Sequence, residues 1–214
     1  MKKMLSALLS ALLLFCTITA CAPADKEYFV FSANLSADAE KPVDTVLLDA
    51  HLTSNDTEDY AKAKEKNPDI LSLFKNITPD EVQDRFSVYL LEWGTGTEHL
   101  DRTYLIFDEK VYVLSGKYAR VGQFACYGNM LYYSMDGGSG LFRFVICSFD
   151  LRSKKLRHSD VIGSGANPVV FFLSEDKKTI SIEEVEFGLT VGGQIIKEPK
   201  RTILYTDIRD IKWE

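Results

Sequence analysis

Residues 130–156 read MLYYSMDGGSGLFRFVICSFDLRSKKL, and this stretch decides the fold class. Two apolar and aromatic runs flank a glycine-rich turn at residues 136–140, and the second run, residues 141–149, is apolar on both faces. Short apolar runs between turn residues are typical of antiparallel strands, and an apolar run on both faces is typical of a central strand. The stretch therefore predicts two neighbouring strands, the second of them buried within a sheet.

The same pattern extends to both sides of this stretch. From residue 86 onward, strands are expected at residues 86–93, 102–107, 111–114, 121–127, 130–135, 141–149, 169–173, 179–185 and 201–206. Ile180 and Ile182 alternate with polar neighbours, as on a half-exposed strand. Because turn clusters separate consecutive runs, the pattern predicts an antiparallel meander. It is compatible with a curved sheet, a sandwich or a partly closed barrel.

The hairpins of residues 130–185 loosely resemble the blades of β-propellers. They share an aromatic strand, a glycine turn, a second strand that ends in Asp, and a short basic turn. A closed propeller typically has 4–8 blades of four strands each. The roughly 129 residues after position 86 supply at most about three such blades. Convergent hairpin chemistry is therefore the preferred explanation of the resemblance.

The part of the chain before residue 86 is of mixed character. Strands are expected at residues 27–34 and 45–49, followed by a helical segment near residues 54–85. The first helix follows capping residues at 54–56 and has acids early and lysines late, an order that suits the helix macrodipole. Its apolar face is thin, which predicts a surface helix, and consists of Tyr60, Ala61 and Ala63.

A second helix is expected after Asn67 and Pro68, with Asn67 as N-cap and Pro68 in the first position. Its apolar residues follow helical spacing and are Ile70, Leu71, Leu73, Phe74 and Ile77. Residues 78–81, TPDE, form a capping box for one or two further turns that end near Arg85. The fold class is therefore mainly β, with α+β character.

The N-terminal segment has the features of an export signal. Residues 1–20 read MKKMLSALLSALLLFCTITA, with two lysines followed by an apolar run at residues 5–15. As a helix that run reaches roughly 16 Å, whereas the hydrocarbon core of a bilayer is roughly 30 Å thick. Residues 1–20 are therefore expected to be a cleaved signal peptide, and they are left out of the fold prediction.

The end of this signal, Ile18-Thr19-Ala20-Cys21, resembles the lipobox of bacterial lipoproteins. The resemblance covers residues 1–21 only and implies that Cys21 is acylated and becomes the mature N-terminus. Residues 21–27 are then the lipidated N-terminus and a short linker, and residues 28–214 form a single mainly β domain. The implied location is the outer face of the bacterial cell membrane, or the outer membrane if the cell has one, with membrane lipid as the partner of the acyl chains.

Charge excludes one class of partner. The chain has 25 bases and 31 acids, and removal of residues 1–20 deletes two lysines, which leaves 23 bases and a net charge of −8. Nucleic-acid binding is driven by neutralisation of phosphates, so no nucleic acid is expected as a partner. By the same argument, the body as a whole gains nothing from an anionic membrane. Plentiful apolar residues, 46% of the chain, exclude a disordered protein.

Two cysteines, Cys126 and Cys147, lie in the body on either side of the glycine-rich turn. An exported protein can form disulfides, so one interpretation is a bond between them. A two-residue turn at Gly137 and Gly138 would place Cys147 opposite Gly128 instead. The other interpretation is a pair of buried free thiols that act as small apolar residues. No CxxC motif or nearby His pair accompanies them, so no metal site is expected.

No motif points clearly to catalysis. The three histidines, His51, His99 and His158, each stand alone, and neither Ser139 nor Ser164 lies in a GxSxG elbow. Three further groups have ordinary structural interpretations as an exposed strand face, a solvated hairpin tip and core aromatics. These are the carboxylates Glu183, Glu184 and Glu186; the basic residues Arg152, Lys154, Lys155, Arg157 and His158; and the tyrosines Tyr104, Tyr112, Tyr118, Tyr127, Tyr132 and Tyr133. The alternatives are that the carboxylates pair with other acids in space, that the basic residues meet an acidic polymer or lipid headgroups, and that the tyrosines line a ligand groove on a curved sheet.

Two functions are compatible with these features. The first is a membrane-anchored, non-catalytic extracytoplasmic domain that binds an envelope component, a peptide or a small ligand, without a cofactor. The alternative is an extracytoplasmic hydrolase whose acid and base residues are scattered over several strands. The alternative requires a pair of carboxylates, or a His within hydrogen-bond reach of an acid, in a concave site.

Overall fold

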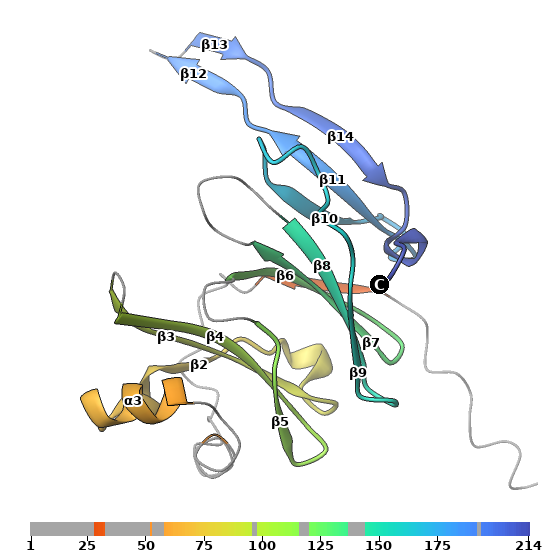
Figure 1. Cartoon of the computed structure of the whole chain (residues 1–214). Helices are drawn as coiled ribbons and strands as arrows, with labels where there is room; N and C mark the ends of the chain where they lie inside the picture. The colour runs from red at the N-terminus through yellow and green to blue at the C-terminus, as the bar shows by residue number, and fades with distance from the viewer. Residues whose placement is uncertain are drawn as a thin grey trace, which may run out of the picture.

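Most strands that follow one another in the sequence also lie side by side in antiparallel sheets (Figure 1). The computed structural model describes residues 28–32, 52, 58–95, 98–115, 120–136, 144–191 and 194–214. The expected strand at 45–49, His51, the helix-capping residues 54–56, the glycine-rich turn with Ser139, and Cys21 lie outside the described residues. The mainly β, antiparallel fold class predicted from the sequence is confirmed.

Three sheets and a two-stranded ribbon make up the described β structure. The four-stranded sheet contains, in order, β2 (Phe74–Asn76), β3 (Ser87–Thr95), β4 (Glu98–Phe107) and β5 (Lys110–Val113). The five-stranded sheet contains, in order, β1 (Phe29–Ser32), β6 (Arg120–Tyr127), β7 (Met130–Asp136), β8 (Phe144–Asp150) and β9 (Lys155–His158). The third sheet contains β10 (Val169–Leu173), β11 (Ile180–Glu186) and β14 (Lys200–Tyr205). The ribbon consists of β12 (Leu189–Val191) and β13 (Gln194–Lys197), and it continues the β11–β14 hairpin away from the sheets (Figure 1).

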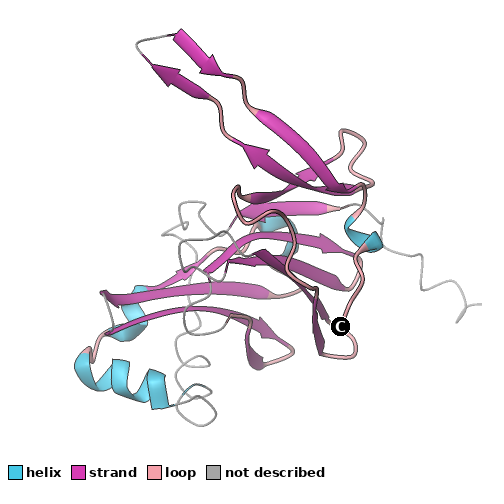
Figure 2. Cartoon of the chain, turned by 45° about the horizontal axis from the view of Figure 1, so that its top comes forward, coloured by secondary structure: helices cyan, strands magenta, loops and turns pink. Residues whose placement is uncertain are grey.

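The sheets are stacked, with the five-stranded sheet in the middle (Figures 1 and 2). Successive side chains of a strand point to opposite faces, so Cys147 packs in the core shared with the four-stranded sheet, and Ile146 packs in the core shared with the third sheet. The outer face of the four-stranded sheet forms a third core with α3 (Glu58–Lys66), in which Tyr60 and Ala63 are buried. Of the architectures compatible with the sequence, the stack corresponds to the sandwich, and none of the described sheets closes into a barrel.

The blade-like character of the hairpins has a counterpart in this stack. The strands β2–β5 and β6–β9 are two successive four-stranded meanders whose first residues, 74 and 120, are 46 positions apart. Each sheet packs face to face on the next, as propeller blades do, but three sheets are too few to close a ring.

The prediction of a second helix after Asn67 and Pro68 is wrong. Residues 70–73 form only η1 (Ile70–Leu73), a single 3₁₀ turn, and the chain then enters β2. Phe74 and Asn76 are buried while Lys75 between them is exposed, which is the period of a strand. Phe74 lies opposite Leu91 of β3, so pairing with a long neighbouring strand outweighs the local helical spacing of the apolar residues.

The capping box at residues 78–81 is also wrong. The Thr78 hydroxyl accepts a hydrogen bond from the backbone N–H of Val88, with 2.7 Å between Oγ1 and N, and so binds β3 instead of a helix start. The short η2 (Asp80–Val82) follows Pro79 without a side-chain cap. The hydrogen bond between the buried Thr78 hydroxyl and the Val88 amide satisfies a buried strand donor, and this stabilises the fold more than capping a single 3₁₀ turn would.

A side chain joins the middle sheet to the third sheet. Gln123 lies at a bulge in β6, where the pairing with β7 shifts between Val121 and Phe124. Its Oε1 accepts from the backbone N–H of Phe171 at 2.7 Å, and its Nε2 donates to the Phe171 carbonyl at 3.5 Å. The carboxamide therefore occupies the backbone groups of β10 that a further strand would otherwise pair with.

The turn between β4 and β5 stores backbone strain that can be measured. Asp108 and Glu109 both have a φ of 55°, in the left-handed region that non-glycine residues avoid. We expect Glu109→Gly to be more stable than Glu109→Ala by about 1 kcal/mol, because only glycine removes the strain while both variants lack the carboxylate. Urea titration of the two variants measures the difference. Equal midpoints at equal slopes would show that the turn is relaxed.

Candidate functional site

The described chain enters the sheets at Tyr28, whose side chain is only 1% exposed. Its ring stacks on Tyr127 of β6 with 4.3 Å between ring centroids. Its backbone N–H donates to the carbonyl of Lys177, in the β10–β11 turn, at 3.0 Å. The first residue of the body is therefore held by two different sheets at once.

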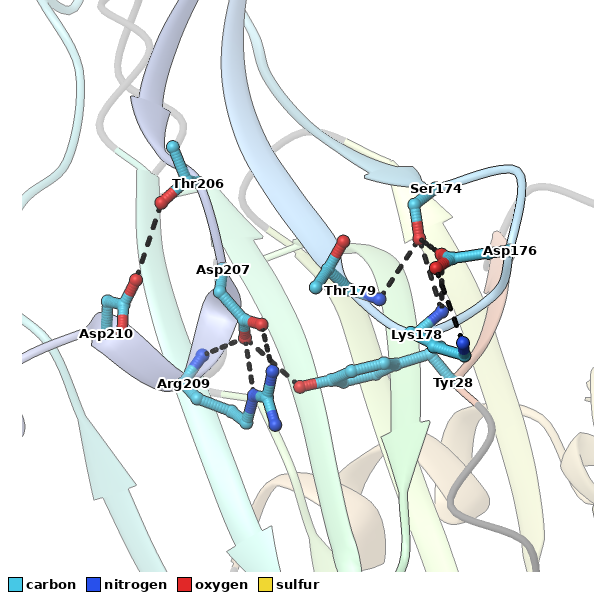
Figure 3. Close-up of polar contacts among 9 residues, drawn as sticks. All are labelled: Tyr28, Ser174, Asp176, Lys178, Thr179, Thr206, Asp207, Arg209 and Asp210. Atoms are coloured by element: carbon cyan, nitrogen blue, oxygen red, sulfur yellow. Dashed lines mark hydrogen bonds and ion pairs between the residues drawn. The ribbon is translucent and has the colours of Figure 1, made fainter.

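The Tyr28 hydroxyl reaches the C-terminal part of the chain (Figure 3). It donates to Oδ1 of Asp207 at 3.1 Å. Asp207 also caps η3 (Ile208–Asp210), accepting from the backbone N–H of Arg209 at 2.8 Å. Two bonds from the Arg209 guanidinium to Asp207 complete the group, at 2.9 Å from Nε and 2.5 Å from Nη2. The guanidinium also lies 5.7 Å from the Tyr28 ring centroid and 5.4 Å from that of Tyr127.

The charges of this group are set by its surroundings. Burial, followed by the Asp207 charge, raises the pKa of Tyr28 above its ordinary value, so the phenol stays neutral and donates. Burial acts to raise the pKa of Asp207, but the hydrogen bonds from Arg209 and Tyr28 outweigh it and the pKa is lowered. The bond to Asp207 in turn raises the pKa of Arg209. At neutral pH the group is an ion pair closed by a neutral phenol.

Residues 206–214, which we call the C-terminal strap, continue from this group across the five-stranded sheet. Ile208 and Ile211 are buried in the core shared with the third sheet. The Trp213 ring stacks on Tyr132 with 6.0 Å between centroids, and the N–H of Glu214 donates to the carbonyl of His158 at 3.0 Å. The strap thus runs from the β1 side of the sheet to β9. Sequence reasoning missed it, and the available signal was an N-capping Asp followed by two isoleucines three positions apart.

Four further turns lie at the same end of the sheets as Tyr28. The backbone N–H of Leu151 donates to the carbonyl of Asn129 at 2.9 Å, which joins the β8–β9 turn to the β6–β7 turn. The Arg85 guanidinium, in the turn after η2, donates to the carbonyl of Gly128. Lys154 pairs with Asp108 of the β4–β5 turn at 2.5 Å. Together with the β10–β11 turn, these turns form what we call the Tyr28 end, on the right-hand side of Figure 1.

The two body cysteines are buried free thiols in this structure. Cys126 of β6 lies opposite Leu131 and Cys147 of β8 lies opposite Tyr133, so strand β7 separates them. Two strand spacings are about 9.5 Å, beyond the Cα separation that a disulfide spans. The pairing of Tyr133 with Cys147 also makes residues 137–143 the connection, longer than the two-residue turn considered from the sequence.

The predicted carboxylates are not brought together. Glu183 accepts from the Ser181 hydroxyl at 2.7 Å, and Glu186 pairs with Lys197. Glu184 accepts from the Ser164 hydroxyl and from Asn167 Nδ2, the latter at 3.0 Å. These bonds, the one from Ser164 first, lower the pKa of Glu184. The serine that was considered as a nucleophile is thereby used to hold the loop before β10.

One histidine meets an acid. Nδ1 of His158 lies 3.4 Å from Oε2 of Glu214, with 58% and 56% of the two side chains exposed. A hydrogen bond with Asp160 raises the pKa of Glu214. This exposed trio satisfies one geometric condition of the hydrolase alternative. Within the described chain no hydroxyl or thiol hydrogen-bonds to His158, and no group of three or more metal-ligating side chains is present. His51 and the side chain of His99 lie outside what is described.

The tyrosines that might line a groove pack in the cores instead. Tyr104, Tyr132 and Tyr133 are buried, whereas Tyr112 is half-buried and its ring lies against Phe149, with 5.0 Å between centroids. Tyr118 lies outside the described residues. The basic residues 152–158 form the β8–β9 turn and the edge strand β9, all four of whose side chains are exposed. Charged residues on an edge strand oppose pairing with other molecules.

Comparison with known proteins adds no relative. No family model, no curated protein and no solved structure matches the chain significantly. Among the helices of the described residues, none has the length and apolar character needed to cross a membrane.

The buried thiols predict a chemical protection pattern. Burial raises the pKa of Cys126 to about 12 and that of Cys147 to about 11, so neither forms thiolate near neutral pH. We expect both to resist maleimide in the folded protein and to react after unfolding, as measured by peptide mass spectrometry. The control variant Ser153→Cys, on the exposed β8–β9 turn, should react at once. Rapid native labelling of Cys147, or a disulfide-linked peptide pair, would contradict the structure.

The group around Asp207 predicts a pH-dependent contribution to stability. Asp207→Asn should lower the free energy of unfolding by about 1–2 kcal/mol at pH 7, because it breaks the charge-assisted bonds to Arg209. The folded-state pKa of Asp207 is depressed, so the contribution is complete above the ordinary Asp pKa of about 3.9 and is lost as pH falls through the folded value. Denaturant titrations of both proteins between pH 7 and pH 3 measure it.

The matched control is Asp210→Asn, an exposed carboxylate on the same 3₁₀ turn. It should change the free energy of unfolding by less than about 0.5 kcal/mol. Equal effects of the two substitutions, or a wild-type advantage over Asp207→Asn that persists unchanged at pH 3, would show that the ion pair does not hold the strap.

Proposed function

We propose that the protein is an exported lipoprotein whose acylated Cys21 holds a non-catalytic binding domain at the outer face of a bacterial membrane. The observation that carries the proposal is the order of two lysines, an apolar run of eleven residues and Ile18-Thr19-Ala20-Cys21. Such a run is too short to span a bilayer but suits a signal that is cut before the cysteine. Acyl chains on Cys21 stabilise membrane attachment by about 0.8 kcal/mol for each buried CH₂.

The place where the body begins supports the proposal. Tyr28 is already buried, and only residues 22–27 separate it from Cys21. Six residues span at most about 22 Å when extended, so the domain would lie close to the lipid headgroups. Tyr28 binds both the β10–β11 turn and the C-terminal strap, so a force on the linker would be transmitted directly to the packed sheets.

A binding role is supported by the two-stranded ribbon. The β11–β14 hairpin leads away from the Tyr28 end, and from Ile180 to Val191 an extended strand covers at most about 36 Å. Phe187, between β11 and β12, is 69% exposed. A domain held at its Tyr28 end would therefore present this apolar side chain away from the bilayer, where a peptide or envelope component is met.

The hydrolase alternative has one supporting observation, the contact of His158 with Glu214. Both side chains are more than half exposed, so water screens the interaction between them. The nearby serine, Ser159, has its hydroxyl bonded to the backbone of Ile146 and Asp160. Binding without catalysis is therefore the function we favour.

Acylation is tested by labelling cells that express the full chain with radioactive palmitate. The wild type should carry label and sediment with membranes, because the lipobox cysteine is the acyl acceptor. Cys21→Ala should lose both properties.

The matched control is Cys16→Ala, which removes the other cysteine of the signal and should keep the label. Label that persists in Cys21→Ala would refute the proposal, as would a mature N-terminus other than Cys21 in mass spectrometry.

A further inference from the structure

We infer that the free edge of β14 is a docking site, at which an extended segment of another protein adds to the third sheet as a further strand. This inference rests on the binding role proposed above, because it names the class of ligand and the surface that receives it. β14 is an edge strand in the order β10–β11–β14, and among the described residues β11 is the only strand that pairs with it (Figure 1).

The backbone of β14 defines what can bind there. Its pairing with β11 is regular from Lys200 to Ile203, and the side chains of these four residues are all exposed. Pro199, directly before the strand, has no N–H, so the ladder begins at Lys200. An edge strand presents N–H and C=O groups at regular intervals, and the backbone of another extended chain matches this spacing.

An apolar side chain lies at this edge. Ile203 is 59% exposed and lies opposite Glu183 of β11. Ile182 is buried in the core shared with the middle sheet, so Glu183, which follows it, points to the outer face of the third sheet together with Ile203. A strand added to β14 would place a side chain directly beside Ile203. An aliphatic side chain in that position would remove apolar surface from water.

The base that shares this face with Ile203 does not guard the edge. A charged side chain on an edge strand opposes pairing with another chain. The guanidinium carbon of Arg201, however, lies 4.0 Å from the ring centroid of Phe172, which belongs to β10 on the far side of the sheet. The Arg201 side chain therefore reaches across β11, away from the free edge, and Lys200 is the remaining base of the strand.

Two other edges of the sheets are occupied by groups of the chain itself. The opposite edge of the third sheet is capped at Phe171 by Gln123. The edge of β9 receives a backbone hydrogen bond from Glu214 at the carbonyl of His158. No comparable contact to the free edge of β14 is made by the part of the chain that the structure describes.

The occupant that these observations fit is a short extended segment of a different protein. From Cys21 onward each copy of this chain has 23 bases and 31 acids, a net charge of −8, and like net charge opposes association of two copies. In strand addition the main-chain hydrogen bonds supply affinity, and alternate side chains supply specificity. At β14 the side chain beside Ile203 is selected for apolar character, so the segment has Val, Ile or Leu at alternate positions.

The test measures binding of a synthetic strand to the full chain, expressed with its export signal and isolated from membranes in detergent. The probe is a fluorescein-labelled peptide of sequence GSTTVTVTTSK, and its anisotropy is followed during titration with the protein. Two matched peptides carry N-methyl groups, one on both Val and the other on the Thr that follows each Val. N-methylation removes the backbone donors from one edge of the peptide and leaves those of the other edge.

The unmodified peptide should bind, and exactly one of the two N-methylated peptides should bind about tenfold or more weakly, because only one edge of the peptide pairs with β14. Hydrogen exchange of the backbone at residues 200–203 should slow when the peptide is bound. Exchange at residues 155–158 of β9 should not change.

The variant Ile203→Lys should weaken binding about fivefold or more, because it replaces the apolar contact with a charge at the edge. The matched control is Val113→Lys on β5, an edge strand of the four-stranded sheet, where the side chain is 39% exposed. It should bind like the wild type. Both substitutions are on exposed side chains, and equal unfolding midpoints of the two variants verify that the fold is retained.

Absence of binding at about 1 mM protein, or equal binding of the two N-methylated peptides, would overturn the inference. Concentration-dependent dimers that disappear in Ile203→Lys would overturn it as well, since a second copy would then occupy the edge. Palmitate labelling of Cys21 tests the proposed anchor separately. Label without peptide binding overturns the docking site alone, whereas peptide binding without label supports the docking site and refutes the anchor.

Discussion

The constraint behind the architecture is a sheet that is apolar on both faces. Along β8, Ile146 and Cys147 are neighbours that point in opposite directions, and both are buried. Such a sheet cannot expose either face to water without losing about 25 cal/mol for each Å² of apolar surface. It therefore requires one further layer on each side. The four-stranded sheet that supplies one layer has an apolar outer face of its own, and α3 covers it. The order of layers follows from short connections between consecutive strands.

This explains which parts of the fold were accessible from the sequence. Strands such as β10 and β11 are bounded by turn residues and contain alternating or continuous apolar side chains, so local pattern was sufficient. The prediction for residues 70–77 was wrong because their apolar spacing fits a helix equally well. Only the pairing of Phe74 with Leu91 makes residues 74–76 a strand. Strand β9 was not predicted for the opposite reason, since all four of its side chains are exposed and backbone hydrogen bonds to β8 and, at His158, to Glu214 hold it.

The candidate site divides in the same way. The proposed signal and the proposed acylation site at Cys21 are predicted from contiguous residues, because an export signal acts as a local sequence. The group that closes the body joins Tyr28 to Asp207, which are 179 positions apart, and no local pattern links a phenol to so distant a carboxylate. The Tyr28 end could not be predicted from any sequence motif, since five turns from separate parts of the chain contribute to it.

The carboxamide of Gln123 affects the tendency of the protein to aggregate through an open sheet edge. An open strand edge is a template on which a second chain can add, and repeated addition gives fibres. The Gln123 carboxamide gives Phe171 one donor and one acceptor, as the backbone of a neighbouring strand would. Unlike a strand, it has no second edge on which another chain could pair. At Phe171 the edge of β10 is therefore capped by a single side chain, which opposes the addition of another strand at this position.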